Sequence, residues 1–202
     1  VAIIRDLVGE HHRAFALARR VVKKAHIRKV IEPGVFTEVP EDRARDYVID
    51  LKSQTWDPPA GVNRTLWEHA LIITVPTTVS HTTGMLFIDG GNNPANLSSP
   101  NDAWLRDIAV RSQSVVARLR QVPNQPLTFA NDPLSLARTE DAQIAYCWRQ
   151  SLDAGGDPED AIWLSRLPMT KSAVRAMDTV TAFCAGSGVG GHTVSTFVVS
   201  GA

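Results

Sequence analysis

Two apolar segments that end at glycine constrain the fold of this chain more than any other feature. Residues 85–88 form a short apolar run that leads into Gly90 and Gly91, and residues 197–199 form a second run that leads into Gly201. Short runs that are nearly all apolar are typical of strands buried on both faces of a sheet. Glycines at the carboxyl edge of such a strand leave backbone N–H groups open to a ligand. The two segments therefore predict a helix-covered sheet with a backbone-donor site at one edge.

The rest of the pattern indicates an α/β fold. The predicted strands are residues 47–51, 69–76, 84–89 and 193–199, with a short candidate at 126–129, and the predicted helices are residues 101–119, 139–152 and 170–183. Because the strands begin as an antiparallel pair and later alternate with helices, we expect a mixed, mostly parallel sheet with helices on both faces.

Residues 1–45 form a separate basic extension ahead of the domain, which we place at residues 46–202. Apolar residues recur at near-helical spacing over residues 3–30, with Arg and Lys between them, so an amphipathic helix is predicted there. A peripheral helix that packs on the domain is the simpler interpretation, and contact with a membrane surface is the alternative. The formal net charge of the whole chain is zero, which gives no indication of a nucleic-acid partner.

Other patterns predict no chemistry. Residues 186–191 match the letters of a dinucleotide-binding glycine motif, but they follow a predicted helix and precede a strand, the reverse of the required order. The six histidines lack metal-ligand spacing, so neither a metal nor a cofactor is predicted. His69 lies at the start of an apolar strand and is interpreted as a structural histidine. Cys147 and Cys184 are interpreted as small buried hydrophobes, with a disulfide between them as the alternative.

Gly90, Gly91 and Asn92 are the candidate site residues. Their position after a buried strand suits an oxyanion hole, in which backbone N–H groups bind the negative charge that develops on a carbonyl oxygen. Asn92 and Asn93 would add side-chain donors, and Asp89 would fix the loop by accepting backbone N–H bonds. A plain strand-ending turn, to which glycine and asparagine are also suited, is the alternative.

Six sequence motifs resemble those of a known family. They are LKSQTW at 51–56, WEH at 67–69, LFIDGGN at 86–92, QVPNQPL at 121–127, EDAQIAY at 140–146 and LPMTKSAVRAMD at 167–178. In this order they resemble the PhoPQ-activated pathogenicity-related protein family, over about residues 46–202. The resemblance implies an α/β-hydrolase-like fold and a secreted or periplasmic protein.

The resemblance also implies where a nucleophile would lie. In that family the strand matching residues 197–200 continues into Gly-Ala-Ser-Lys-Arg-Gly, a turn of the nucleophile-elbow type. Gly201 and Ala202 match its first two positions, so we expect the serine immediately after Ala202 and the acid and histidine further on. The given chain alone is then expected to be inactive and to require the C-terminal half of the same protein.

The implied function is that of a serine hydrolase. Its substrate would be a small molecule or peptide with an ester, thioester or amide bond, and no cofactor is expected. The alternative is a secreted binding or signalling protein that keeps the hydrolase scaffold without turnover, because a fold does not fix a function.

Overall fold

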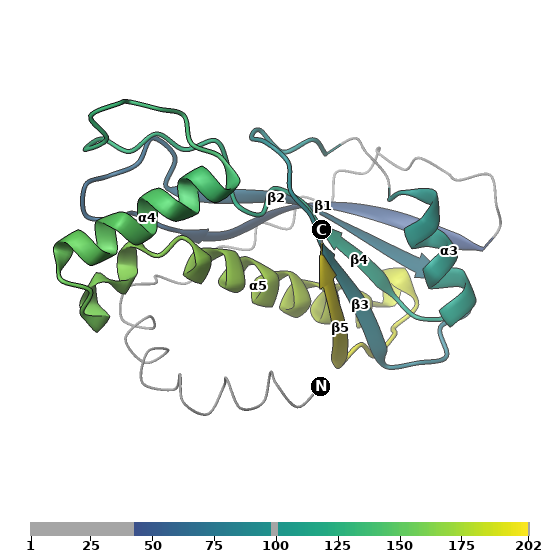
Figure 1. The fold of residues 1–202 in the computed structure, drawn as a ribbon. Helices are drawn as coiled ribbons and strands as arrows, with labels where there is room; N and C mark the ends of the chain where they lie inside the picture. The colour runs from purple at the N-terminus through teal and green to yellow at the C-terminus, as the bar shows by residue number, and fades with distance from the viewer. Residues whose placement is uncertain (1–42, 98–100, 202) are drawn as a thin grey trace.

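The computed structural model describes residues 43–97 and 101–201, which have a mixed α/β architecture (Figure 1). The amphipathic helix predicted over residues 3–30, its membrane contact and most of the predicted extension 1–45 lie outside the described residues. The first described strand begins at Ala44, slightly ahead of the predicted domain start. None of the described helices is long and apolar enough to cross a membrane.

A five-stranded mixed sheet forms the centre of the fold. The strands are β1 (Ala44–Thr55), β2 (Leu66–Pro76), β3 (Thr83–Ile88), β4 (Val116–Leu119) and β5 (Thr196–Gly201). Their order is β1-β2-β4-β3-β5; β2 pairs antiparallel with β1 and β4, while β3 pairs parallel with β4 and β5. The predicted mixed sheet is confirmed. Only β2 runs against the others, yet half of the pairings are antiparallel, so the sheet is less parallel than expected.

In the described part of the chain, α-helices connect and cover the strands (Figure 1). α3 (Ala103–Ser112) follows β3, whereas α4 (Glu140–Ala154) and α5 (Arg166–Cys184) lie between β4 and β5. Short 3-10 turns at Pro158–Trp163 and Ser187–Val189 complete the connections. The helices predicted at 139–152 and 170–183 are thus confirmed. α5 begins earlier than predicted because a proline, here Pro168, is tolerated in the first turn of a helix.

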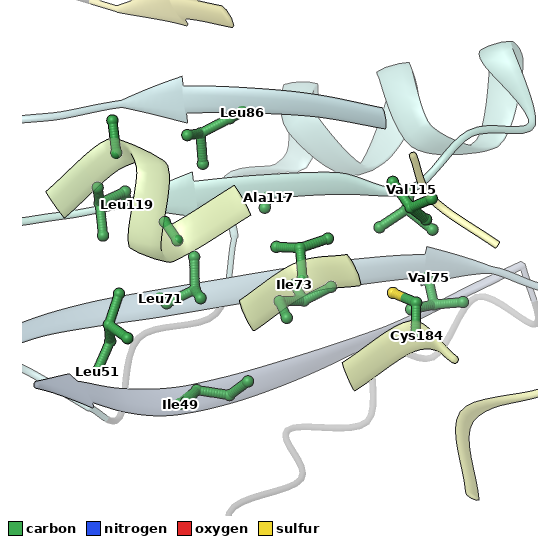
Figure 2. Close-up of a cluster of buried hydrophobic side chains, with 14 of the residues drawn as sticks. Ile49, Leu51, Leu71, Ile73, Val75, Leu86, Val115, Ala117, Leu119 and Cys184 are labelled. Carbon is green, nitrogen blue, oxygen red and sulfur yellow. The ribbon is translucent and has the colours of Figure 1, made fainter. Parts of the chain in front are cut away.

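The larger core fills the space between the sheet and α5 (Figure 2). Leu71 of β2, Ala117 of β4 and Leu86 of β3 are fully buried there. Ala176 and Val180 of α5 pack against them from the helix side. Full burial of a leucine side chain stabilises a fold by about 1.5–3 kcal/mol, so these contacts fix α5 across the middle of the sheet.

A smaller core lies on the other face of the sheet, beneath α3. Phe87 and Val116 face this side, each adjacent in its strand to a residue that faces α5. Leu105 and Ala109 of α3 pack against them. Because successive residues of a strand point to opposite faces, the two clusters show that helices cover both faces of the sheet.

The helix predicted over residues 101–119 is wrong in its second half. α3 ends at Ser112, and Gln113 closes it in the left-handed conformation, with φ of 50°. The chain then turns and forms β4, which lies in the middle of the sheet. The apolar residues of 115–119 fit helical spacing as well as a short buried strand, so periodicity alone does not separate the two structures.

The short strand predicted at residues 126–129 is not a strand of the sheet. Leu127 pairs with Arg138, and Phe129 pairs with Val62, through isolated bridges. Both apolar side chains are buried in a separate cluster that also contains residues of α4. Packing in this cluster explains the alternation of Leu127 and Phe129 with polar residues. Such alternation shows that one side of the segment is buried, and a segment outside a sheet can also have it.

Cys147 and Cys184 are free thiols buried in different clusters. Cys184 packs under α5 against the sheet, whereas Cys147 packs in the cluster at α4. Burial raises the pKa of each thiol to about 11, so both stay protonated at neutral pH. The interpretation as small buried hydrophobes is confirmed, and the disulfide alternative is not.

Candidate functional site

Backbone bonds hold the loop after β3 beside the segment that follows β4. The N–H of Asp89 donates to Leu119 O at 2.8 Å. The carbonyl oxygens of Asp89 and Gly90 accept from the N–H groups of Val122 and Gln121 at 3.1 and 3.0 Å. The β3–β4 pairing thus continues past the end of both strands, at the carboxyl edge of the sheet. Ligands of open α/β sheets bind at this edge.

The backbone N–H groups of Gly90, Gly91 and Asn92 are open. Within residues 43–97 and 101–201, none of the three donates a hydrogen bond. Gly91 has φ of +121°, a conformation that residues with side chains rarely adopt. Consecutive amide donors without acceptors can bind an oxygen that carries negative charge. The three predicted site residues therefore lie together with the donors that an oxyanion hole needs.

Two buried carboxamides fix the far side of this loop. The backbone carbonyl oxygen of Gln125 accepts from Asn93 N at 2.6 Å, and the side-chain Nε2 of Gln125 donates to Asn92 Oδ1 at 3.3 Å. Asn124, which is fully buried, donates from Nδ2 to Asn93 Oδ1 at 3.1 Å. The asparagine side chains of the loop thus accept bonds from the scaffold through Oδ1, and the buried Nδ2 of Asn93 has no partner among the described residues, so their role as additional donors stays a prediction.

Glu140, the first residue of α4, lies on the same side of the loop. Its N–H donates to Gln125 Oε1 at 2.6 Å, and its Oε1 accepts from Gln125 Nε2 at 3.4 Å. Oε1 lies 3.6 Å from the position that a Cβ on Gly90 would occupy. Because Glu140 is exposed, water and salt screen its charge. The carboxylate would oppose an anion at the loop, and this screening reduces its effect.

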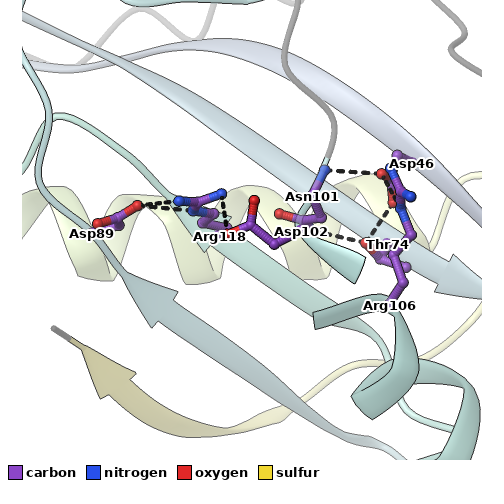
Figure 3. A network of polar contacts seen from close by, with 7 residues as sticks. All are labelled: Asp46, Thr74, Asp89, Asn101, Asp102, Arg106 and Arg118. Carbon is purple, nitrogen blue, oxygen red and sulfur yellow. Dashed lines mark hydrogen bonds and ion pairs between the residues drawn. The ribbon is translucent and has the colours of Figure 1, made fainter. Parts of the chain in front are cut away.

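Arg118 of β4 ties together the two ends of the β3–α3 loop (Figure 3). Its Nε donates to Asp89 Oδ2 at 2.9 Å, and its Nη2 donates to the same oxygen. Its Nη1 lies 3.1 Å from Oδ2 of Asp102, the residue that precedes α3. Bonds between ionised groups are stronger than neutral ones. The prediction that Asp89 accepts backbone N–H bonds is therefore wrong, because its carboxylate is held by Arg118 instead.

A second network joins the start of α3 to the sheet (Figure 3). Asp46 of β1 is buried and accepts hydrogen bonds from Thr74 Oγ1 at 2.6 Å, Asn101 N at 3.0 Å and Arg106 Nε at 2.9 Å. Asn101 also donates from Nδ2 to Thr74 Oγ1 at 2.7 Å. The position of α3, and with it the end of the loop, is thus fixed independently of Arg118.

The carboxyl end of β5 lies beside the β3 end of this loop. Ile88, the last residue of β3, pairs with Gly201. A Cβ on Gly201 would come within 3.0 Å of Ile88 O, so this close approach requires glycine. β5 is the outer strand of the described sheet, and Val198 and Val199 on it are exposed.

His69 is a buried structural histidine, as predicted. Its Nδ1 lies 3.0 Å from Arg120 O, which can only accept, so Nδ1 carries the proton and Nε2 accepts from Ser53 Oγ at 3.0 Å. Ser53 in turn lies 3.0 Å from Ser172 Oγ. Burial lowers the pKa of His69 to about 4. Because all three side chains have no exposed surface, this serine–histidine pair cannot reach a substrate.

Sequence reasoning missed the scaffold of the loop, which is formed by Arg118, Gln121, Asn124 and Gln125. The available signal was the group of carboxamides directly after an apolar run. Because the apolar run also predicts a helix, its pattern does not place the carboxamides at the carboxyl edge of the sheet. Among the described residues, no group of His, Cys, Asp or Glu is arranged to hold a metal ion.

A comparison with known protein families identifies the family of this chain. The sequence matches the PhoPQ-activated pathogenicity-related protein family over residues 31–202. The chain belongs to this family. The match begins ahead of residue 46, where the resemblance in the motifs starts, and includes all of the described strands and the loop after β3.

A similar curated protein is Autocrine proliferation repressor protein A of Dictyostelium discoideum. It is 39% identical to this chain over 158 residues, which make up 77% of the chain and 30% of that protein. The chain therefore spans less than a third of the length of this relative. No solved structure matches the chain.

Proposed function

We propose that this chain forms the first part of the catalytic domain of a serine hydrolase with an α/β-hydrolase scaffold. The observation that carries the proposal is the loop after β3, where the N–H groups of Gly90, Gly91 and Asn92 have no acceptor among the described residues. In that scaffold the loop after the third strand supplies an oxyanion donor, and the nucleophile follows a later strand in a sharp turn. The end of β5 lies beside this loop, so a serine after Ala202 would stand close to these donors.

The order of the strands supports the scaffold assignment. An α/β-hydrolase sheet begins with the order 1-2-4-3-5 and with its second strand reversed, and the described sheet has this order and these directions. α3 and α5 lie on opposite faces, so the connections after β3 and β4 leave the sheet on opposite sides. A crevice at the carboxyl edge, between strands with diverging connections, is the usual ligand site of such sheets.

The reaction would be acyl transfer to the serine. The serine Oγ bonds to the carbonyl carbon of an ester, thioester or amide, its proton passes to a histidine of the C-terminal half, and the C=O electron pair moves to the oxygen. The N–H groups of Gly90, Gly91 and Asn92 bind that oxyanion, together with the N–H of the residue after the serine. The C=O bond then re-forms as the bond to the leaving group breaks, the histidine protonates that group, and water hydrolyses the acyl-enzyme.

The proposed partner of this chain is the C-terminal half of the same protein. An unpaired strand edge that carries exposed valines is a template for a further strand, and Val198 and Val199 of β5 are 59% and 42% exposed. Their coverage by the C-terminal half would extend the sheet and bring the histidine and acid to the loop. From the family resemblance we infer that the protein acts in the periplasm or outside the cell.

A second candidate function is signalling or binding without turnover. The relative that is named a proliferation repressor favours it, because that name describes a regulatory role rather than a reaction. The two candidates differ in what must follow Ala202. A hydrolase needs a serine there, and an acid and a histidine later, whereas a binding protein needs none of them.

The test is the reaction of the complete protein with a fluorophosphonate, which modifies the activated serine of hydrolases. Hydrolysis of p-nitrophenyl acetate should be lost in proportion to labelling, with one label for each folded molecule. Heat-denatured protein, in which the serine has no base and no oxyanion donors, should stay unlabelled. Hydrolysis that persists at full labelling, or folded protein that neither reacts nor hydrolyses, would contradict the proposal.

Replacing Arg118 with methionine should lower turnover, because the change releases Asp89 at the β3 end of the loop, while the Asp46 network still holds the α3 end. The free energy of unfolding should fall by about 1–3 kcal/mol through the lost charge-assisted bonds. Arg106→Met is the matched control, since Arg106 also joins α3 to the sheet but does not contact the loop. It leaves the buried carboxylate of Asp46 without its cation, so it should destabilise by about 3–5 kcal/mol and keep the turnover of the folded fraction.

Denaturant unfolding and ester hydrolysis of the folded fraction distinguish the two arginines. Equal losses of turnover in Arg118→Met and Arg106→Met would mean that Arg118 only stabilises α3.

A further inference from the structure

Gln121 is a buried side chain that packs against the open loop. It follows β4 at the carboxyl edge of the sheet, is 1% exposed and has φ of +59°. Its backbone N–H donates to Gly90 O at 3.0 Å. A residue with a side chain adopts this conformation only where its surroundings hold it. The backbone thus fixes Gln121 to the loop.

The orientation of the Gln121 carboxamide is set by Ala70. The backbone N–H of Ala70 donates to Gln121 Oε1 at 2.8 Å, and in a carboxamide only the oxygen can accept. The amide nitrogen therefore occupies the other position, 3.4 Å from where a Cβ on Gly91 would lie. A side chain at residue 91 would cover this nitrogen, so the glycine leaves it accessible from the loop.

The amide nitrogen of Gln121 lacks an acceptor. In the part of the chain that the structure describes, Nε2 makes no hydrogen bond, whereas the amide nitrogens of Asn124 and Gln125 each bond to the loop. The Gln121 side chain is buried as a whole, but Gly91 leaves its amide nitrogen open toward the loop, so this donor faces the candidate site. An oxygen bound at the N–H groups of Gly90 and Gly91 would lie within the reach of Nε2 and supply the missing acceptor.

We propose that Gln121 Nε2 is a side-chain donor of the oxyanion hole and binds the carbonyl oxygen of an acyl substrate. This inference rests on the proposed hydrolase function. When the serine Oγ bonds to the carbonyl carbon, the C=O electron pair moves to the oxygen, and Nε2 hydrogen-bonds to that oxyanion while it keeps both protons. The side chain is rigid because Ala70 and Gly90 hold it at both ends, so it needs no rearrangement during the reaction.

Two substitutions in the complete protein separate this role from a structural one. Gln121→Glu keeps an oxygen for the Ala70 N–H and replaces the donor with a second oxygen, whereas Gln121→Met removes both donor and acceptor. For an oxyanion donor, kcat for p-nitrophenyl acetate should fall about 100-fold in Gln121→Met and further in Gln121→Glu, measured at mildly alkaline pH. KM should change by less than about threefold, since the bond strengthens only in the transition state.

A structural role predicts the opposite order, because Gln121→Glu preserves the bond to Ala70. Phenylboronic acid, which forms a tetrahedral adduct with a reactive serine, provides a second readout. Its affinity should fall in the same order as kcat. The matched control is Gln143→Met, at a fully buried glutamine of α4 whose amide also lacks a partner but lies outside the loop. This control should keep kcat, expressed per serine titrated with fluorophosphonate.

Unchanged kcat in folded Gln121→Met, or a greater loss in Gln121→Met than in Gln121→Glu, would overturn the inference. If Gln121→Glu does not fold, kcat of the folded Gln121→Met protein alone tests the inference. A wild-type protein without a reactive serine would instead overturn the proposed hydrolase function.

Discussion

Acidification from pH 6.5 to pH 4 is expected to lower the free energy of unfolding by about 3 kcal/mol through His69 alone. His69 has no exposed surface, and loss of hydration on burial is the main cause that lowers its pKa from 6.5 to about 4. Its Nε2 accepts from Ser53 and its Nδ1 donates to Arg120 O, so the neutral ring satisfies both neighbours.

The sign of this effect follows from proton binding. Above pH 6.5 the histidine is neutral in both the folded and the unfolded chain, so its full contribution to stability is present. As the pH falls from 6.5 toward 4, the unfolded chain binds a proton that the folded chain still excludes, and stability is lost. Below about pH 4 both states are protonated, and the histidine causes no further loss.

Denaturant unfolding of the complete protein at neutral pH and near pH 4 measures this loss. His69→Gln removes the titrating ring, so the variant should lose less stability on acidification than the wild type by about 3 kcal/mol. His81→Asn is the control because the side chain of His81 is exposed. An equal acid-induced loss in the wild type and in His69→Gln would contradict this account of the buried ring.

Gly91→Val is expected to reduce turnover about 100-fold or more and also to destabilise the fold. Valine does not readily adopt φ of +121°, which should lower the free energy of unfolding by about 1–3 kcal/mol. Its Cβ would also lie 3.4 Å from Gln121 Nε2, so the side chain would cover the proposed donors. The folded fraction of the variant should also lose turnover, because the reaction depends on the position of a few N–H groups in the loop.

Gly61→Val separates the two effects. Gly61 lies between β1 and β2, has φ of +77°, and a Cβ there would meet no atom within 4 Å. The variant therefore carries backbone strain without a change at the loop, so it should lose a similar amount of stability and keep its turnover. Thermal unfolding and ester hydrolysis of the folded fraction give both quantities. A Gly91→Val protein with full turnover would exclude the loop from the reaction.

The elements with long, regular patterns could be predicted from the sequence. The apolar run of β2 ends at its proline, and that of β3 ends just before the glycine pair, as predicted. The apolar residues of α4 and α5 recur at helical spacing, and Pro168 is compatible with the first turn of α5. β4 could not be predicted, because its few apolar residues satisfy both periods and the end of α3 depends on the left-handed conformation of Gln113. A turn of this kind leaves no mark in a hydrophobic pattern.

The position of the glycine loop could be predicted from the sequence, but the side chains that hold the loop could not. Gly90 and Gly91 indicate the end of a strand without any other information, because they follow the apolar run of β3 directly in the sequence. The bonds from Arg118, Gln121 and Gln125 to the loop depend on β4 lying next to β3, a contact between segments far apart in the sequence. The apolar residues of 115–119 also fit a helix, and a helix there would not bring these side chains to the loop.

The measurement that tests the central claim most directly is the site of fluorophosphonate modification, mapped by peptide mass spectrometry of the complete protein. We predict a single adduct, on the serine that follows Ala202, in the peptide that contains the end of β5. An adduct on any other residue, or folded protein in which that position is absent or unmodified, would contradict the proposal that this loop and strand form the active site of a serine hydrolase.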